Sequence, residues 1–71
     1  MNKLWVTKNK FYKINISRNL LNQWIIVCWW GSLITKRGNN KKTLAKNYEE
    51  AYNFLKLISK RRIAHGYIEV F

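Results

Sequence analysis

Apolar and polar residues alternate in the first part of the chain, as they do in strands with one buried face. Residues 10–16 show this most clearly, and they place Tyr12, Ile14 and Ile16 on one side of a predicted strand. Residues 4–7 are also rich in strand-favouring side chains, but the segment is short. It is therefore either a first strand or a loosely packed leader.

The strongest strand signal covers residues 23–30 and follows a turn and loop over residues 17–22, which contain two anchoring leucines. Both alternating sets of residues 23–30 are apolar, so we expect a central strand that is covered on both faces. Trp24 and Trp29 then belong to the core. Gly31 interrupts the pattern, as a bulge or a point of close backbone approach would.

The next segments are polar and basic. Residues 32–37 continue as a strand, and the Gly-Asn-Asn sequence at residues 38–40 predicts a hairpin turn, because these residue types tolerate positive φ. Residues 41–46 form a third clear strand.

The apolar period then changes to that of a helix. Asn47 is a suitable N-cap, and Glu50 follows three residues later, as in a capping box. Basic residues 60–62 suit the last helical turn, Gly66 suits the position after it, and residues 67–71 predict a short final strand. The predicted buried face of the helix repeats at i, i+3, i+4 and i+7 and consists of Ala51, Phe54, Leu55 and Ile58.

The order of these elements predicts an α+β fold, in which one α-helix packs across an antiparallel β-sheet of four to five strands. The 71 residues suffice for one domain, which we expect to span residues 1–71 with a core at about residues 10–67.

Composition adds a strong charge imbalance to this picture. The chain has 14 Lys and Arg against 3 acids, a net charge of +11, together with four Trp and 48% hydrophobic residues. Disordered chains are poor in aromatics, and no run of about 18 apolar residues or signal-peptide pattern is present. We therefore expect a folded cytoplasmic domain, in agreement with its lone Cys28.

The residues offer little for catalysis or metal binding. Glu49 and Glu50 are explained by the start of the helix, and Glu69 is the only other acid. Cys28 and His65 are single residues of their types and cannot form a four-ligand zinc site. We expect a non-catalytic protein with no cofactor and no metal.

The positive charge gathers in three groups, which would attract a phosphate backbone without regard to base sequence. An ordinary solvated face is the alternative interpretation. One group lies near the start of the chain, one flanks the predicted hairpin and one lies late in the helix. Their members are Lys8, Lys10 and Lys13; Lys36, Arg37, Lys41 and Lys42; and Lys56, Lys60, Arg61 and Arg62.

Five pieces of the chain, in this order and spacing, resemble the WGR domain family, which is named for a Trp-Gly-Arg motif. They are residues 11–14, 19–24, 30–32, 49–51 and 60–67. The family occurs in DNA-break-sensing poly(ADP-ribose) polymerases and as short stand-alone bacterial proteins.

This resemblance implies DNA binding at strand ends or nicks, with Trp30 as the residue that packs against a sugar. Ser32 stands where the family has its motif Arg, which in the polymerases takes part in contacts between domains. The nine candidate nucleic-acid-binding residues are Trp30, Lys36, Arg37, Lys41, Lys42, Lys56, Lys60, Arg61 and Arg62.

Several alternatives stay open at this stage. Trp30 is either a stacking residue or part of the core. The partner is nucleic acid, with DNA favoured over RNA, or else an acidic protein. Binding to a membrane surface is not expected, because the sheet needs the apolar face of the helix. We expect a monomer.

Overall fold

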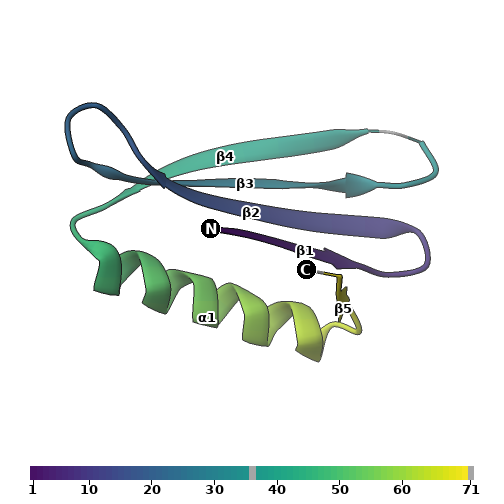
Figure 1. The fold of residues 1–71 in the computed structure, drawn as a ribbon. Helices are drawn as coiled ribbons and strands as arrows, with labels where there is room; N and C mark the ends of the chain where they lie inside the picture. The colour runs from purple at the N-terminus through teal and green to yellow at the C-terminus, as the bar shows by residue number, and fades with distance from the viewer. Residues whose placement is uncertain (36, 71) are drawn as a thin grey trace.

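The computed structural model describes residues 1–35 and 37–70 and shows one helix lying across a five-stranded antiparallel sheet (Figure 1). The strands are ordered β4-β3-β2-β1-β5. The predicted α+β class is confirmed. In chain order the elements are β1 (Asn2–Val6), β2 (Lys10–Arg18), β3 (Trp24–Ser32), β4 (Gly38–Ala45), α1 (Tyr48–Ala64) and β5 (Ile68–Glu69).

The N-terminal segment is a strand and not a loose leader. It pairs with β2 along its whole length and with β5 on its other side. The N-terminal amine of Met1 donates a hydrogen bond to the carbonyl oxygen of Ile16 at 3.0 Å. Trp5, near the end of the strand, is fully buried.

The turn between β3 and β4 lies earlier than predicted. The chain turns at residues 33–35 and β4 begins at Gly38, so the strand predicted for residues 32–37 is wrong over residues 33–35, and the turn predicted at residues 38–40 is wrong. Residue 36 lies outside the described residues. Ser32 directs this turn, because its Oγ accepts hydrogen bonds from the amides of Ile34 (3.1 Å) and Thr35 (3.2 Å).

Gly31 is a point of close backbone approach, as the sequence predicts. It lies opposite Gly38 in the ladder between β3 and β4. A Cβ atom added to Gly31 would lie 2.2 Å from the carbonyl oxygen of Arg37 and 2.7 Å from the Cα of Gly38. Only glycine therefore lets the two strands meet in this way.

The start of α1 follows its sequence signals. Asn47 is the N-cap, and its Oδ1 accepts a hydrogen bond from the amide of Glu50 at 2.8 Å. The Glu50 carboxylate in turn accepts one from the amide of Lys46 at 3.4 Å. Among the described residues, no helix has the length and apolar character needed to cross a membrane.

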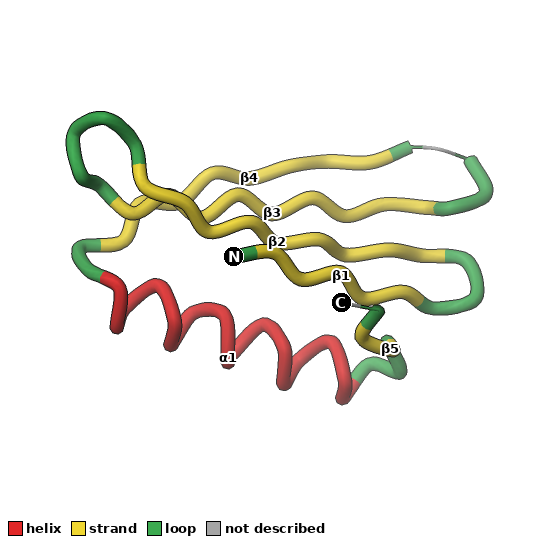
Figure 2. The backbone as a smooth tube through the Cα atoms, viewed as in Figure 1, coloured by secondary structure: helices red, strands yellow, loops and turns green. Residues whose placement is uncertain are grey.

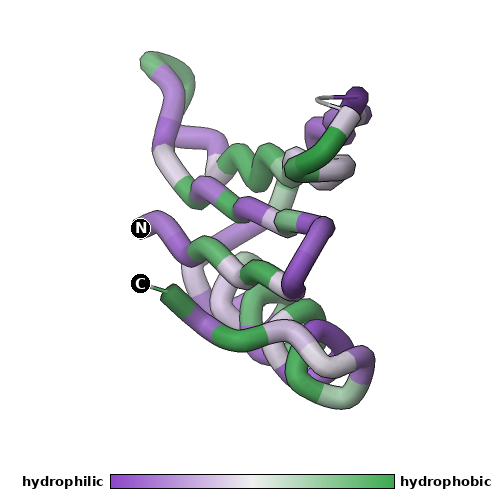
Figure 3. The backbone as a smooth tube through the Cα atoms, turned by 90° about the vertical axis from the view of Figure 1, so that its right-hand side faces the viewer, coloured by the Kyte–Doolittle hydropathy of each residue, from purple (hydrophilic) through white to green (hydrophobic). Residues whose placement is uncertain are grey.

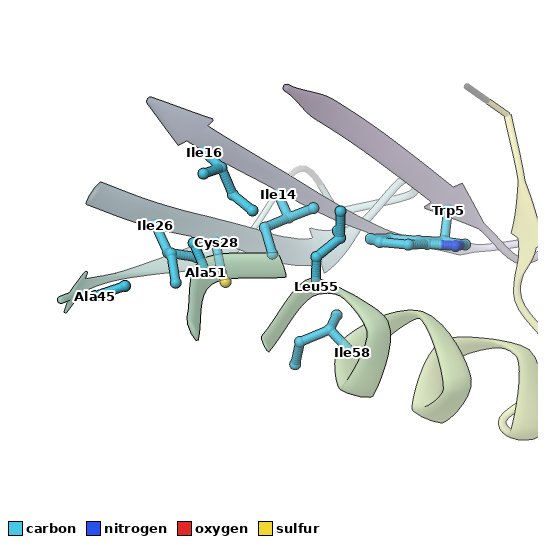
Figure 4. Packing of buried hydrophobic residues seen from close by; sticks show 9 residues of the cluster. All are labelled: Trp5, Ile14, Ile16, Ile26, Cys28, Ala45, Ala51, Leu55 and Ile58. Carbon is cyan, nitrogen blue, oxygen red and sulfur yellow. The ribbon is translucent and has the colours of Figure 1, made fainter. Parts of the chain in front are cut away.

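The core lies between α1 and one face of the sheet (Figure 4). The expectation that both faces of β3 are covered is wrong, because the single helix lies on one side. Trp24 is half-buried and packs against this core, in line with its predicted core role, whereas Trp29 points to the opposite face and is not the core residue predicted. The buried residues are Trp5, Ile14, Ile16, Ile26, Cys28, Ala45, Ala51, Leu55 and Ile58.

The connections gather at the two ends of the sheet. The β1–β2 and β3–β4 turns, β5 and the last turn of α1 share one end, and the β2–β3 loop lies at the other (Figure 2). Viewed from the first end, the β1–β2 turn stands out as hydrophilic (Figure 3). This end brings together segments that are far apart in the sequence.

Candidate nucleic-acid interface

Trp30 lies near the end of β3, on the face that α1 covers. Tyr12 of β2 is its direct partner across the ladder, and the two rings stack with centroids 6.0 Å apart and planes 14° from parallel. Trp5 of β1 follows on the other side of Tyr12, with ring centroids 6.2 Å apart. Strand register therefore builds an aromatic row in which Trp30 is the half-buried outer member.

A cavity of about 470 Å³ opens beside this row, between the end of the sheet and the end of α1. We call it the Trp30 cavity. Its lining combines three aromatic rings with two basic side chains and the backbone at the β3 end. The lining residues are Lys10, Tyr12, Trp30, Gly31, Ser32, Arg62 and Tyr67.

Arg62 provides a positive charge at the cavity. Its guanidinium carbon lies 4.4 Å from the ring centroid of Tyr12 and 5.1 Å from that of Tyr67, within the range of cation–π attraction. Its Nε atom is buried and has no hydrogen-bond partner among the residues that the structure describes. A buried charged donor without a partner is costly, so this group is well suited to receive an anionic acceptor.

The end of α1 positions Arg62 and Tyr67 together. The amide of Tyr67 donates to the carbonyl of Arg62 at 2.9 Å, and the amide of Gly66 donates to that of Ile63 at 3.1 Å. These two bonds, with Gly66 at φ 84°, make a Schellman motif. The predicted role of Gly66 is confirmed, and the motif turns Tyr67 back toward the sheet.

Tyr12 stays protonated in this setting. Burial, together with the neighbouring Cys28 thiol, raises the pKa of Tyr12 to about 12, although Arg62 and Arg61 act in the opposite direction. Near neutral pH the phenol is therefore a neutral hydrogen-bonding group and does not act as a base.

Trp30 also lines a second cavity, on the β4 side. This cavity is about 550 Å³ and is lined by Trp30, Gly31, Arg37, Gly38 and Asn39. Arg37 is exposed there. Two of the predicted basic residues, Arg37 and Arg62, thus lie on either side of the segment that contains Trp30.

The other predicted residues are more scattered. Lys41 and Lys42 belong to β4 and not to a turn, so they point to opposite faces of the sheet, opposite Cys28 and Val27 respectively. Lys36 lies outside the described residues.

On the helix, Lys60 and Arg61 are exposed near its end. Lys56 has its Nζ 5.1 Å from the ring centroid of Tyr52 and lines a different cavity with Lys3 and Glu69. It is not part of the Trp30 cavity.

Sequence reasoning missed the aromatic partners Tyr12 and Tyr67. Tyr12 faces Trp30 because of the register of β2 and β3, and the Schellman motif positions Tyr67 beside the cavity. One signal could have paired Tyr12 with Trp30. Residues 10–16 and residues 23–30 each alternate, and matching the two alternating patterns places the two rings on the same face of the sheet.

This geometry defines a small basic α+β domain with a cavity lined by aromatic and cationic side chains. The family model of the WGR domain matches residues 2–70, and the chain therefore belongs to the WGR domain family. WGR is a binding-type domain, known for nucleic-acid binding in poly(ADP-ribose) polymerases. Searches of curated proteins and of solved structures gave no match.

The sequence resemblance places the family motif at Trp30-Gly31-Ser32 of this chain. Trp30 lines both cavities, Gly31 allows β4 to approach, and Ser32 holds the turn through its hydroxyl. The cavity that contains Ser32 in place of the motif Arg also contains the guanidinium of Arg62.

Proposed function

We propose that this protein is a non-catalytic nucleic-acid-binding module that binds DNA at ends or nicks through the Trp30 cavity. The observation that carries this proposal is the buried, unpartnered Nε of Arg62 beside the stacked rings of Tyr12 and Trp30. An anionic phosphate would satisfy the guanidinium, and an aromatic ring would accept a sugar or base.

Each group then has a distinct role in binding. Arg62, Lys10 and Arg37 hold phosphates, while the exposed part of Trp30 packs on the terminal sugar or base. The remaining candidates add positive potential without direct readout of bases, so preference is for DNA structure and not for sequence. These remaining candidates are Lys36, Lys41, Lys42, Lys56, Lys60 and Arg61.

A titration against blunt, nicked and intact circular DNA tests this function. Contact with about four to six phosphates predicts that log affinity falls with log salt at a slope of about −4 to −5. Intact circular DNA, which has no ends, is the control and should bind more weakly. A flat salt response, or no binding at low salt, would contradict the proposal.

Trp30→Ala tests the aromatic part of the site. We expect this variant to lose about 1–3 kcal/mol of binding free energy to ends, because stacking of this size is typical of one aromatic residue. Binding to intact circles should change little, since phosphate contacts remain. Electrophoretic mobility shifts on both DNAs give the comparison.

Trp24→Ala is the matched control. Trp24 lies on the same face of β3 but at its other end, beside Tyr48 at a ring-centroid distance of 5.3 Å. The Trp24→Ala substitution removes the same side chain as Trp30→Ala, but far from the Trp30 cavity. If Trp24→Ala and Trp30→Ala lose the same preference for ends, the role given to Trp30 is wrong.

A second candidate function is binding of a protein partner. Leu20 and Leu21 are 103% and 78% exposed, so the expectation that they anchor the loop is wrong. Asn19 orders this loop, because its Oδ1 accepts hydrogen bonds from the amides of Leu21 and Gln23, both at 2.9 Å. A partner that remains bound after nuclease treatment, and is lost on Leu20→Ser, would favour this function.

A further inference from the structure

The sheet has a second face, and no helix covers it within residues 1–35 and 37–70. Residues on this open face alternate with the core residues along each strand, and they include Phe11 of β2 and Trp29 of β3. Both rings are half-buried, and neither packs against the hydrophobic core on the other side. Their presence there is not explained by the packing of α1.

The register places the two rings next to each other on the central strands. Lys13 faces Trp29 across the ladder, and Phe11 faces Gly31 in the adjoining row. Phe11 and Trp29 are therefore diagonal neighbours, at roughly 7–8 Å. Gly31 faces Gly38 in turn, so the row continues from Phe11 across β3 and β4 without side chains.

Aliphatic residues extend this surface along β3 and β4. Ile25 and Val27 share the face with Trp29 and are half-buried, and Leu44, opposite Ile25, is 56% exposed. The open face is thus an apolar surface with two aromatic rings at one end.

Charge on this face is positive. The Nζ of Lys13 lies 5.6 Å from the ring centroid of Trp29, and Lys42 faces Val27 in the next row. Two of the chain's three acids lie on α1. The third, Glu69, pairs with Lys3 at 3.2 Å and lies opposite Trp5, on the other side of the sheet.

The positive charge of the open face favours some binding partners over others. A second copy of the chain would bring another +11 toward the same surface, which opposes self-association through it. A single-stranded nucleic acid has the complementary features, because its bases are flat and apolar and its backbone is anionic. Sheets with aromatic residues on their central strands commonly bind single strands by stacking bases on those rings.

We propose that the open face of the sheet binds single-stranded nucleic acid. Successive bases stack on Trp29 and Phe11, and Lys13 and Lys42 hold the flanking phosphates. This site goes beyond the Trp30 cavity, since Trp29 and Trp30 point to opposite sides of the sheet.

The test measures binding of a dye-labelled single-stranded oligothymidine by fluorescence anisotropy at low salt. Trp29→Ala and Phe11→Ala should each weaken binding by about fivefold to a hundredfold, the range expected for one stacked base. Trp29→Phe keeps an aromatic ring and should restore most of the affinity. Trp24→Ala, which removes the same side chain from the same strand but from its opposite face, is the matched control and should change single-strand binding by less than about twofold.

A second measurement addresses the phosphates. Lys13→Gln should lower the steepness of the salt dependence by about one unit, as expected for one phosphate contact. Because Lys13 is exposed, this variant does not depend on core packing. An unchanged slope together with unchanged affinity of Trp29→Ala would overturn the proposal.

The outcomes separate this proposal from that for the Trp30 cavity. Loss of single-strand binding in Trp29→Ala but not in Trp30→Ala supports the open-face site. The reverse result would mean that single strands bind in the Trp30 cavity, and it would overturn the open-face site. Binding of duplex ends without any binding of single strands overturns the open-face site alone. A wild-type dimer that Trp29→Ala converts to a monomer, seen by sedimentation, would identify a second copy as the occupant.

Discussion

At the scale of single residues, the Trp30 cavity contains one side chain, Tyr12, whose pKa is raised by its surroundings. Tyr12 lies between two indole rings and beneath the Arg62 guanidinium. Tyr12 stays neutral up to high pH because burial disfavours the phenolate. Tyr12 therefore contributes a neutral phenol to the cavity over the whole physiological range.

The raised pKa of Tyr12 has a consequence for stability at high pH. The folded-state pKa of about 12 exceeds the ordinary value of 10.0, so the native state holds its proton more tightly than the unfolded state. The contribution of the protonated Tyr12 to the free energy of unfolding is fully present below about pH 10 and is lost as the pH rises toward 12. Urea unfolding across this window should show the loss.

Tyr12→Phe is the control, because it has no proton to lose. The difference in unfolding free energy between wild type and this variant should change between pH 10 and 12 and be constant below that window. A constant difference throughout would contradict the assigned pKa. All other residues are the same in the two proteins, so the comparison isolates Tyr12.

At the scale of elements, the helix was predictable and the sheet only partly so. Capping by Asn47, the apolar period and Gly66 are local signals, and all three are confirmed. The β3–β4 turn was misplaced, because the Gly-Asn-Asn composition resembles a turn while Gly31 and Gly38 are required for strand contact. Whether Gly38 belongs to a turn or to a strand depends on the pairing of β3 with β4, which local sequence does not reveal.

β1 illustrates the same limit. Residues 4–7 are too short a segment for their alternation to identify a strand, yet β1 supplies Trp5, the largest buried side chain. Its position depends on pairing with both β2 and β5, which come from distant parts of the chain. The candidate site shows the same pattern: charge and motif identified Trp30, Arg37 and Arg62, but not their aromatic partners.

Trp5→Ala should destabilise the protein strongly. Removal of a fully buried tryptophan typically costs about 3–5 kcal/mol, a large share of the stability of a domain this small. Thermal or urea unfolding followed by circular dichroism measures the change. Trp29→Ala, which lies outside the core, is the matched control and should cost much less; equal losses would mean that the open face is as tightly packed as the core.

At the scale of the whole molecule, two aromatic surfaces lie back to back on one thin sheet. Trp29 and Trp30 are neighbours in sequence, and strand alternation sends one to the open face and the other to the Trp30 cavity. Both surfaces adjoin the Gly31–Gly38 pair. The two proposed sites together would engage a DNA end that carries a single-stranded tail.

This arrangement predicts that a duplex with a single-stranded overhang binds more tightly than a blunt duplex of equal length. Once the end occupies the Trp30 cavity, the tail reaches the open face at high effective concentration, so the two binding energies reinforce each other. Trp29→Ala should remove the gain from the overhang and leave affinity for the blunt duplex unchanged, as measured by competition anisotropy. If the overhang adds nothing in the wild-type protein, although blunt ends and single strands each bind, the two surfaces do not act on one DNA molecule.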